Sequence, residues 1–226
     1  MINKEDTLLL SRRLEFWDQM TQAQKEALSA GTKAVSYKKG QPLHCGECQC
    51  MGVLVIKSGT LRIYITSEEG REVTLYRLDS GDICILSASC ILQAITFDVF
   101  VEAETDCDIL QINSSAFARL SSENVYAELF SYRLATQRFS DVMWAMQQIL
   151  FTSFDKRLAS FLLDESVKNT SDVIHMTHEQ IAKHLGSARE VVSRMLKYFS
   201  REGYVALSRG GITITDKKQL RALLQQ

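Results

Sequence analysis

Short runs of alternating apolar and polar residues fill the stretch from about Gly40 to Ile112. The runs VLVI, TLRIYI and VTLYRL are separated by KSG, SEEGRE and DSGD. A period of two is typical of strands, and short separators that contain Gly are typical of tight turns. We therefore expect corners at Ser58-Gly59, Glu69-Gly70 and Ser80-Gly81. The pattern predicts a small antiparallel β-barrel or sandwich.

The apolar period changes over residues 123–150, which contain neither Gly nor Pro. Apolar residues are now spaced alternately four and three apart, with Thr136 as the one interruption: Val125, Leu129, Tyr132, Phe139, Met143, Met146 and Leu150. Four such heptads predict one long helix that pairs with the same helix of a second copy. The alternative is an amphipathic helix on its own barrel. Further apolar residues flank the seam, so both faces could be partly buried.

Two short helices joined by a turn are predicted further on, after a first helix over 156–165. Thr177 and Gln180 fit a capping box that starts the helix IAKHL, and Gly186 ends that helix. Ser187 is expected to cap the helix AREVVSRMLKYFSREG. Its inward residues should be Val191, Val192, Met195, Leu196 and Phe199. This pattern is the signature of a helix-turn-helix.

A hairpin and a last helix complete this region. The segment YVALSRGGITIT contains two β-rich runs around Arg209-Gly210-Gly211, which predicts a hairpin wing. Thr215 or Asp216 is expected to cap the final helix, KKQLRALL. The C-terminal part of the chain is therefore predicted to be a winged helix-turn-helix.

The second helix of this motif has the side chains needed to read DNA bases. Arg189, Glu190, Ser193, Arg194 and Lys197 lie on the arc that the apolar residues leave exposed. Arg can bond guanine O6 and N7, Glu can accept from cytosine N4, and the ammonium of Lys suits a phosphate. The alternative is a solvated helix in which Glu190 and Arg194 form an ion pair. The preceding capped helix, the turn and the wing favour DNA binding, with Ser187, Thr177 and Arg209 completing the expected contact set.

The charge distribution agrees with a nucleic-acid partner. The net charge is −1, but residues 151–226 contain 12 Lys and Arg against 8 Asp and Glu, and the remainder contains 14 against 19. The two parts therefore have net charges of +4 and −5, and the predicted winged domain is the basic one.

Composition narrows the class of protein. The chain of 226 residues is 46% apolar, enough for two domains with real cores. No apolar run approaches the ~20 residues of a membrane span, and the start has no secretory signal, so we expect a cytoplasmic protein with no membrane partner. The six cysteines are expected to be thiols rather than a disulfide framework.

Taken together, these segments resemble the CRP/FNR regulators from about Leu14 to the end of the chain. KKGQPLHCGE, IKSGTLRIYITSEEGREVTLYRLDSGD and THEQIAKHLGSAREVVSRMLKYFSREGYVALSRGGITI match that family in order and spacing. The resemblance implies an α+β protein with three parts. These are an N-terminal antiparallel β-roll, jelly-roll-like, over 1–120, a dimerisation helix over 121–150, and a winged helix-turn-helix over 151–226.

The resemblance also assigns roles. Glu190, Ser193 and Arg194 match the Glu-x-x-Ser-Arg pattern with which the FNR branch reads its half-sites, and Arg189 matches a position used by the catabolite activator branch. The family implies a homodimer on a palindrome of double-stranded DNA, with half-sites about one helical turn apart, and RNA polymerase as a partner if the protein is an activator.

The expected effector pocket departs from the family pattern. Cyclic-nucleotide-binding members use a Glu for the ribose and an Arg-Ser or Arg-Thr pair for the phosphate. The matching positions here are Leu86, Phe97 and Asp98, with Ser87 and Cys90 also in the expected pocket. Asp98 would repel a phosphate and Leu86 offers no hydrogen bond. Neither cAMP nor cGMP is therefore expected, and the effector is left unidentified.

The cysteines leave two interpretations open. His44, Cys45, Cys48 and Cys50 contain one C-x-x-C and enough soft ligands for zinc or an iron–sulfur cluster. They fall at a hairpin of the β-roll, however, so ordinary turn and core thiols are the alternative. Cys84, Cys90 and Cys107 have apolar surroundings and are expected in the core, with redox or haem sensing as the minority hypothesis.

The remaining features specify no chemistry. His178 and His184 are six residues apart on one helix and are expected at the surface. Met143, Trp144 and Met146 are better explained by the seam than by a cofactor. No motif for catalysis is present, so an enzyme is not expected. The rival hypothesis is a ligand-binding or interaction module whose winged domain contacts protein.

Overall fold

The structure is a computed structural model that describes residues 2–44, 51–85 and 99–225. It divides into two compact units. Unit 1 comprises Met1–Ile65 and Leu75–Val142, and unit 2 comprises Thr66–Thr74 and Met143–Gln226. Each unit has a hydrophobic core of its own.

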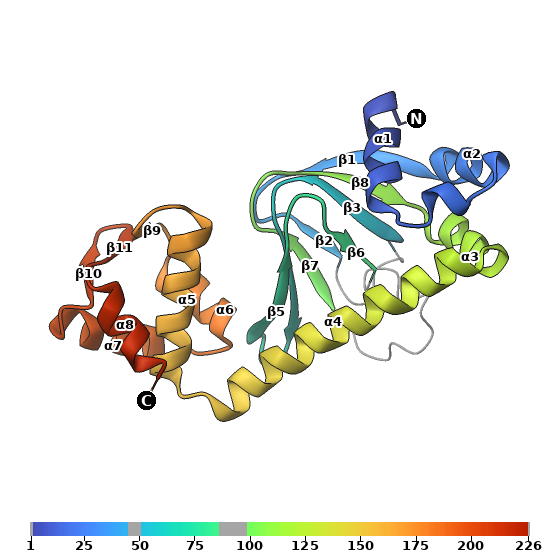
Figure 1. Cartoon of the computed structure of the whole chain (residues 1–226). Coiled ribbons are helices and arrows are strands. Elements are labelled where there is room, and N and C mark those ends of the chain that lie inside the picture. The colour runs from blue at the N-terminus through green and yellow to red at the C-terminus, as the bar shows by residue number, and fades with distance from the viewer. Residues whose placement is uncertain (1, 45–50, 86–98, 226) are drawn as a thin grey trace. The chain divides into compact units, whose positions relative to one another are not determined.

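Two four-stranded sheets form the β-roll of the chain (Figure 1). One has the order β1 (Thr32–Tyr37), β8 (Cys107–Ile112), β3 (Val53–Ser58) and β6 (Ile83–Cys84), and its paired strands are antiparallel. The other has the order β2 (Pro42–His44), β7 (Phe100–Ala103), β4 (Leu61–Thr66) and β5 (Glu72–Leu78). Gly59, Gly70 and Gly81 have φ between +77° and +92°, so the three expected corners are confirmed.

The run VLVI is apolar at every position because strand β3 is buried on both of its faces. In β3, Val53 and Val55 belong to one hydrophobic cluster, and Leu54 and Ile56 belong to another. The second cluster also takes side chains from β4, β7 and β8, so it fills the space between the two sheets. Alternate residues of β3 thus point to opposite sides of its sheet.

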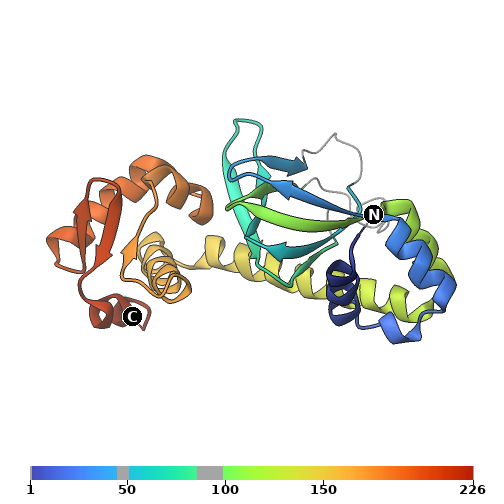
Figure 2. The same ribbon diagram turned by 90° about the horizontal axis from the view of Figure 1, so that it is seen from above.

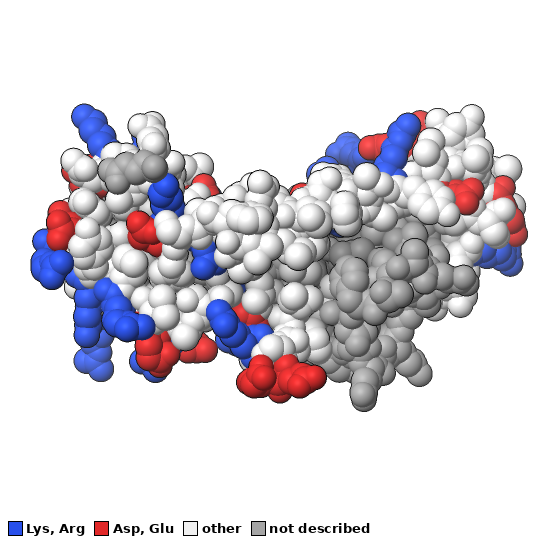
Figure 3. All heavy atoms as spheres, turned by 90° about the horizontal axis from the view of Figure 1, so that it is seen from below, with Lys and Arg blue, Asp and Glu red and all other residues white. Residues whose placement is uncertain are grey.

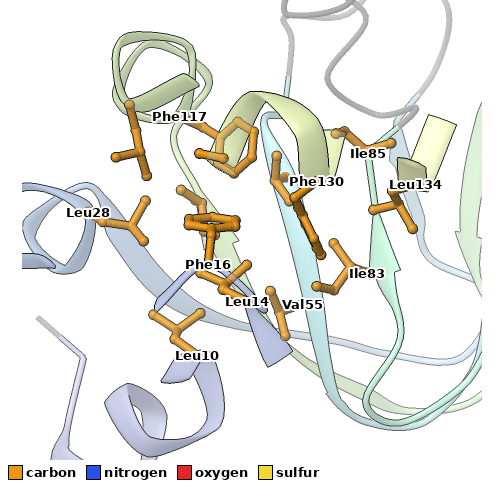
Figure 4. Close-up of a cluster of buried hydrophobic side chains, with 14 of the residues drawn as sticks. Leu10, Leu14, Phe16, Leu28, Val55, Ile83, Ile85, Phe117, Phe130 and Leu134 are labelled. Atoms are coloured by element: carbon orange, nitrogen blue, oxygen red, sulfur yellow. The ribbon is translucent and has the colours of Figure 1, made fainter. Parts of the chain in front are cut away.

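Helices cover the outer face of the sheet that contains β3 (Figure 2). They are α1 (Lys4–Arg13), the 3-10 turn η1 (Trp17–Gln19), α2 (Gln22–Ala30), α3 (Ser114–Glu123) and α4 (Val125–Phe151). Phe16 lies at their centre and makes edge-to-face contacts with Phe117, at 6.4 Å between ring centroids, and with Phe130, at 5.2 Å (Figure 4). This cluster attaches the first half of α4 to the roll.

The helix α4 carries two different apolar stripes. Asn124 accepts hydrogen bonds from the backbone N–H groups of Tyr126 and Ala127 and so caps its first turn. Ala127, Phe130 and Leu134 are buried in the cluster around Phe16. The predicted seam lies on another face, where its seven apolar side chains are 44–68% exposed: Val125, Leu129, Tyr132, Phe139, Met143, Met146 and Leu150. The prediction that both faces of this helix could be partly buried is thus confirmed for the face that contacts the roll.

Unit 2 contains the predicted helices and wing. Its elements are α5 (Phe154–Lys168), β9 (Val173–Ile174), α6 (His178–Leu185), α7 (Arg189–Arg201), β10 (Val205–Ser208), β11 (Gly211–Ile214) and α8 (Lys217–Leu223). The three strands form an antiparallel sheet in the order β10-β11-β9. Asp216 caps α8 through the backbone N–H groups of Lys218 and Gln219, which decides between the two expected caps.

Candidate nucleic-acid interface

The turn between α6 and α7 sets the geometry of the helix-turn-helix. Thr177 and Gln180 form the expected capping box at the start of α6. Gly186 ends that helix with φ +58° and ψ +45°, a left-handed conformation that favours glycine. The two helices pack on a shared core that includes Ile181, Val192 and Leu196.

The expected role of Ser187 as the cap of α7 is wrong. The cap residue is Ala188, and no side chain caps this helix. The N–H of Ser187 instead donates to the carbonyl oxygen of Ala182 at 2.9 Å. Since this bond closes the left-handed C-terminus of α6, Ser187 belongs to the end of α6 rather than to the start of α7.

The charged residues of the polar arc predicted on α7 are exposed, and Ser193 in the same arc is half-buried. Val192, Leu196 and Phe199 are fully buried, whereas Arg189, Glu190, Arg194 and Lys197 are exposed. Within the described residues, neither Glu190 nor Arg194 forms an ion pair, so the i,i+4 pair of the alternative interpretation is absent there. These charged groups are available to an external partner.

A contact that the sequence did not predict joins the two helices. The Nδ1 of His178, at the start of α6, lies 2.7 Å from the hydroxyl oxygen of Ser193 on α7. His178 and His184 are both half-buried, so the expectation that they are surface residues is wrong. Burial, followed by the positive charges of Arg189 and Lys197, lowers the pKa of His178. The signal in the sequence was only that His178 directly follows the capping residue.

The wing completes this face. Ser208 and Gly211 pair at its tip, Gly210 has φ +93°, and Arg209 between them is exposed. A groove of about 220 Å³ lies between the wing and the start of α6, and His175, Thr177, His178 and Ser208 contribute to its lining. In the space-filling view, several Lys and Arg side chains project from unit 2, at the left, with acidic side chains among them (Figure 3).

The structure does not test the expected effector pocket or the C-x-x-C segment. Leu86, Ser87, Cys90, Phe97 and Asp98 lie outside the described residues, and so do Cys45, Cys48 and Cys50. Of the cysteines expected in the core, Cys84 and Cys107 are buried as predicted. Burial raises the pKa of the Cys107 thiol, which donates to the carbonyl oxygens of Thr60 and Thr105. In the described ranges, His, Cys, Asp and Glu side chains form no group of three that could hold a metal ion.

Sequence reasoning missed a polar cluster between β5 and α4. Arg138, only 8% exposed, bonds to Asp141 at 2.8 Å and lies over the ring of Tyr76 at 5.2 Å. The hydroxyl of Tyr76 and the Nε of Arg138 are buried, and neither has a hydrogen-bond partner among the described residues. Burial also raises the pKa of Tyr76. The spacing of Arg138 and Asp141, away from the seam, was the available clue.

Comparisons with known proteins match both parts of the chain. A family model described as a cyclic nucleotide-binding domain matches residues 34–124, and one described as a Crp-like helix-turn-helix domain matches residues 156–223. A solved structure from Eubacterium rectale, assigned to the CRP/FNR family of transcriptional regulators, is 46% identical. The match covers 95% of this chain and all of that one, with a TM-score of 0.92.

The chain belongs to the CRP/FNR family. The expected family, the α+β fold and the order of β-roll, long helix and winged helix-turn-helix are thereby confirmed. Two more distant relatives are also similar to this chain. The transcriptional regulatory protein btr of Bordetella pertussis is 23% identical, with 85% of this chain and 81% of that protein covered. The cAMP-activated global transcriptional regulator Vfr of Pseudomonas aeruginosa is 25% identical, with 74% and 81% covered.

All three of these relatives are named as transcriptional regulators. Within the described ranges, no helix combines the length and the apolar character that a membrane span requires.

Proposed function

We propose that this CRP/FNR protein regulates transcription as a cytoplasmic homodimer that reads a palindrome in double-stranded DNA and has no enzymatic activity. The observation that carries the proposal is the exposed arc of α7. Arg189, Glu190 and Arg194 lie there beside the half-buried Ser193, and these three charged residues have no ion-pair partner among the described residues. Such an arc can place donors and acceptors in a major groove.

The chemistry of each side chain in this arc determines which part of the DNA we expect it to contact. Glu190, Ser193 and Arg194 are proposed to contact base edges, as in the FNR-type Glu-x-x-Ser-Arg pattern. Arg189 and Lys197 are proposed to contact phosphates. Thr177, at the start of α6, lines the groove beside the wing, and Arg209 is exposed in the wing itself. We expect both residues to make further contacts with the DNA backbone.

The exposed seam of α4 supports the homodimer. A soluble monomer rarely exposes a contiguous apolar stripe, and this one has the heptad spacing of a coiled coil. The space-filling view shows a mostly white band across its middle, a stretch of surface poor in charged side chains (Figure 3). A second copy of α4 would cover the seam and bring two recognition helices onto one DNA duplex.

The same helix offers a route for the signal. The roll-facing stripe around Phe130 and the seam around Phe139 belong to the same helix, α4. A ligand that changes the packing of α4 on the roll would therefore also change the seam, and with it the spacing of the two DNA-binding domains. Such coupling requires two dimer arrangements with different DNA affinity.

We propose that the signal is not a cyclic nucleotide, although Vfr is cAMP-activated. The support is chemical: Leu86, Phe97 and Asp98 stand where the cyclic-nucleotide-binding members have Glu and an Arg-Ser or Arg-Thr pair. RNA polymerase is proposed as a partner only if the protein is an activator.

Fluorescence anisotropy tests the proposal as a whole. The full chain is titrated into a labelled FNR-like palindrome and into a scrambled duplex of the same composition, at several salt concentrations. We expect tighter binding to the palindrome by at least ~10³-fold, and an affinity for both that falls as salt rises. Equal affinity for the two duplexes, or no dependence on salt, would contradict it. Retention on a protein partner without DNA binding would favour the interaction module instead.

A further inference from the structure

The contact between His178 and Ser193 determines how the Ser193 hydroxyl can bond to anything else. Their Nδ1 and Oγ atoms are 2.7 Å apart, and both side chains are half-buried. A serine hydroxyl has one proton to donate and two lone pairs that accept. The imidazole uses either the proton or one of the lone pairs, according to where its own proton lies.

The two cases give Ser193 opposite polarity. When Nδ1 carries no proton it accepts from the serine, so the Oγ keeps only lone pairs and can accept from an adenine or cytosine amino group. When Nδ1 is protonated it donates to Oγ, and the serine proton is free for a base acceptor such as guanine O6 or thymine O4. The presence or absence of a proton on Nδ1 of His178 thus determines which kind of base group Ser193 can bond to.

We propose that His178 is a positioning and specificity-determining residue, which in its neutral form, with the ring proton on Nε2, holds Ser193 as a hydrogen-bond acceptor and on protonation of Nδ1 turns it into a donor. The inference rests on the proposed reading of DNA by α7. It adds a pH-sensitive element to that reading, located outside the recognition helix itself.

The surroundings of His178 favour the neutral form. Arg189 and Lys197 of α7 are the cations that act on it, and with burial they lower its pKa. His175 lines the same groove from the segment before α6, and Ser208 lines it from the wing. Glu179, the neighbour of His178 on α6, is exposed. Because the pKa lies below the ordinary value of about 6.5, the imidazole is neutral at pH 7.5 and becomes protonated only in a more acidic range.

Base preference across a pH series tests this inference. The full chain is bound to palindromes with all four base pairs at each half-site position, from pH 7.5 down to the lowest pH at which the chain stays folded, and the titration of His178 is followed by NMR over the same range. We expect one position to prefer a base with a major-groove amino group at pH 7.5. That preference should shift by about five- to tenfold toward guanine or thymine as His178 becomes protonated, while the other positions keep their order. An unchanged order across the titration of His178 would overturn the inference.

Variants separate positioning from a loss of folding. His178→Phe keeps the size and apolar contacts, and should remove both the preference at that position and its pH dependence. His178→Gln can still bond to Ser193 but does not titrate, so its preference should not change with pH. Ser193→Ala should abolish the shift as well. A pH shift that persists in His178→Gln would contradict the proposal.

Two further results keep the inference distinct from the proposed function. If the wild-type chain does not discriminate palindrome from scrambled DNA, the proposed function fails; if it does, but His178→Phe keeps the wild-type base order, only the inference fails. Should His178→Phe not fold, ¹⁵N spectra of the wild-type histidines decide. We expect Nδ1 of His178 without a proton at pH 7.5, and a protonated Nδ1 at that pH would overturn the proposal.

Discussion

The ammonium of Lys57 lies 2.5 Å from the Oδ1 of Asp6 and attaches helix α1 to strand β3. Asp6 is only 2% exposed, and its other oxygen accepts a hydrogen bond from the N–H of Asn3, so each carboxylate oxygen has a partner. Burial alone would raise the pKa of Asp6, but the bonds from Lys57 and Asn3 outweigh it, and the pKa is lowered.

We expect Asp6→Ala to lower the free energy of unfolding by about 1–3 kcal/mol at pH 7, because the half-buried Lys57 loses its partner and the N–H of Asn3 loses its acceptor. The lowered pKa fixes the sign of the pH dependence. This contribution is present above the unfolded pKa of about 3.9 and is lost as pH falls through the lower folded value. Urea unfolding at pH 7 and in the acid range measures both effects.

Glu5→Ala is the matched control, since Glu5 is exposed in the same turn of α1. It should change stability by less than about 0.5 kcal/mol. Equal losses for the two variants at pH 7 would show that the ion pair contributes nothing.

The seam of α4 gives a prediction about assembly. Phe139→Glu places a charge in the middle of the seam, where the side chain is 65% exposed in the single chain. We expect this variant to fold as a monomer, because the substitution alters the proposed interface and not the core. Sedimentation equilibrium or light scattering gives the mass directly.

Gln137→Glu adds the same charge to an exposed position of α4 outside the seam and should remain a dimer. A dimeric Phe139→Glu, or a wild-type chain that is monomeric at micromolar concentration, would rule out the seam as the interface.

The buried hydroxyl of Tyr76 gives a prediction with the opposite sign. It has no hydrogen-bond partner among the described residues, and an unsatisfied buried hydroxyl costs about 1–3 kcal/mol. Tyr76→Phe should therefore leave the free energy of unfolding unchanged or raise it by about 1 kcal/mol. Thermal and urea unfolding measure this, with Tyr126→Phe, at an exposed tyrosine, as the control. A clear loss of stability in Tyr76→Phe alone would mean that the hydroxyl has a partner.

Calorimetry tests the proposed exclusion of cyclic nucleotides. Titration of cAMP or cGMP into the full chain should give no heat of binding at micromolar concentrations, because Asp98 would repel the phosphate and Leu86 offers the ribose no hydrogen bond. Leu86→Glu combined with Asp98→Ser restores two of the three family positions and is the informative comparison. Micromolar binding by the wild-type chain would remove this part of the account.

The strands were predictable because burial on each face of a strand repeats with period two. Val53 and Val55 alternate with Leu54 and Ile56, and both sets are buried, which the sequence run VLVI already indicated. The caps at Thr177 and Asp216 were predictable for a similar reason, since a cap depends on residues within three positions of it.

The predictions were wrong or incomplete where the backbone conformation or a residue distant in the sequence determines the position of a side chain. Serine is a residue type that often caps helices, but the N–H of Ser187 closes the left-handed end of α6, and α7 begins two residues later. The contact between His178 and Ser193 and the cluster of Tyr76 with Arg138 join residues 15 and 62 positions apart in the sequence. Periodicity within one element cannot predict such pairs.

Base reading by Arg194 is the central claim. Salt-dependent anisotropy of Arg194→Ala and Lys197→Ala, on the palindrome and on scrambled DNA, tests it most directly. Both side chains are exposed on α7, so both variants should fold. Arg194→Ala should weaken palindrome binding by ~1–3 kcal/mol and leave scrambled DNA nearly unaffected, whereas Lys197→Ala should weaken both and lower the salt slope by about one. An equal loss on both duplexes for Arg194→Ala would contradict the account.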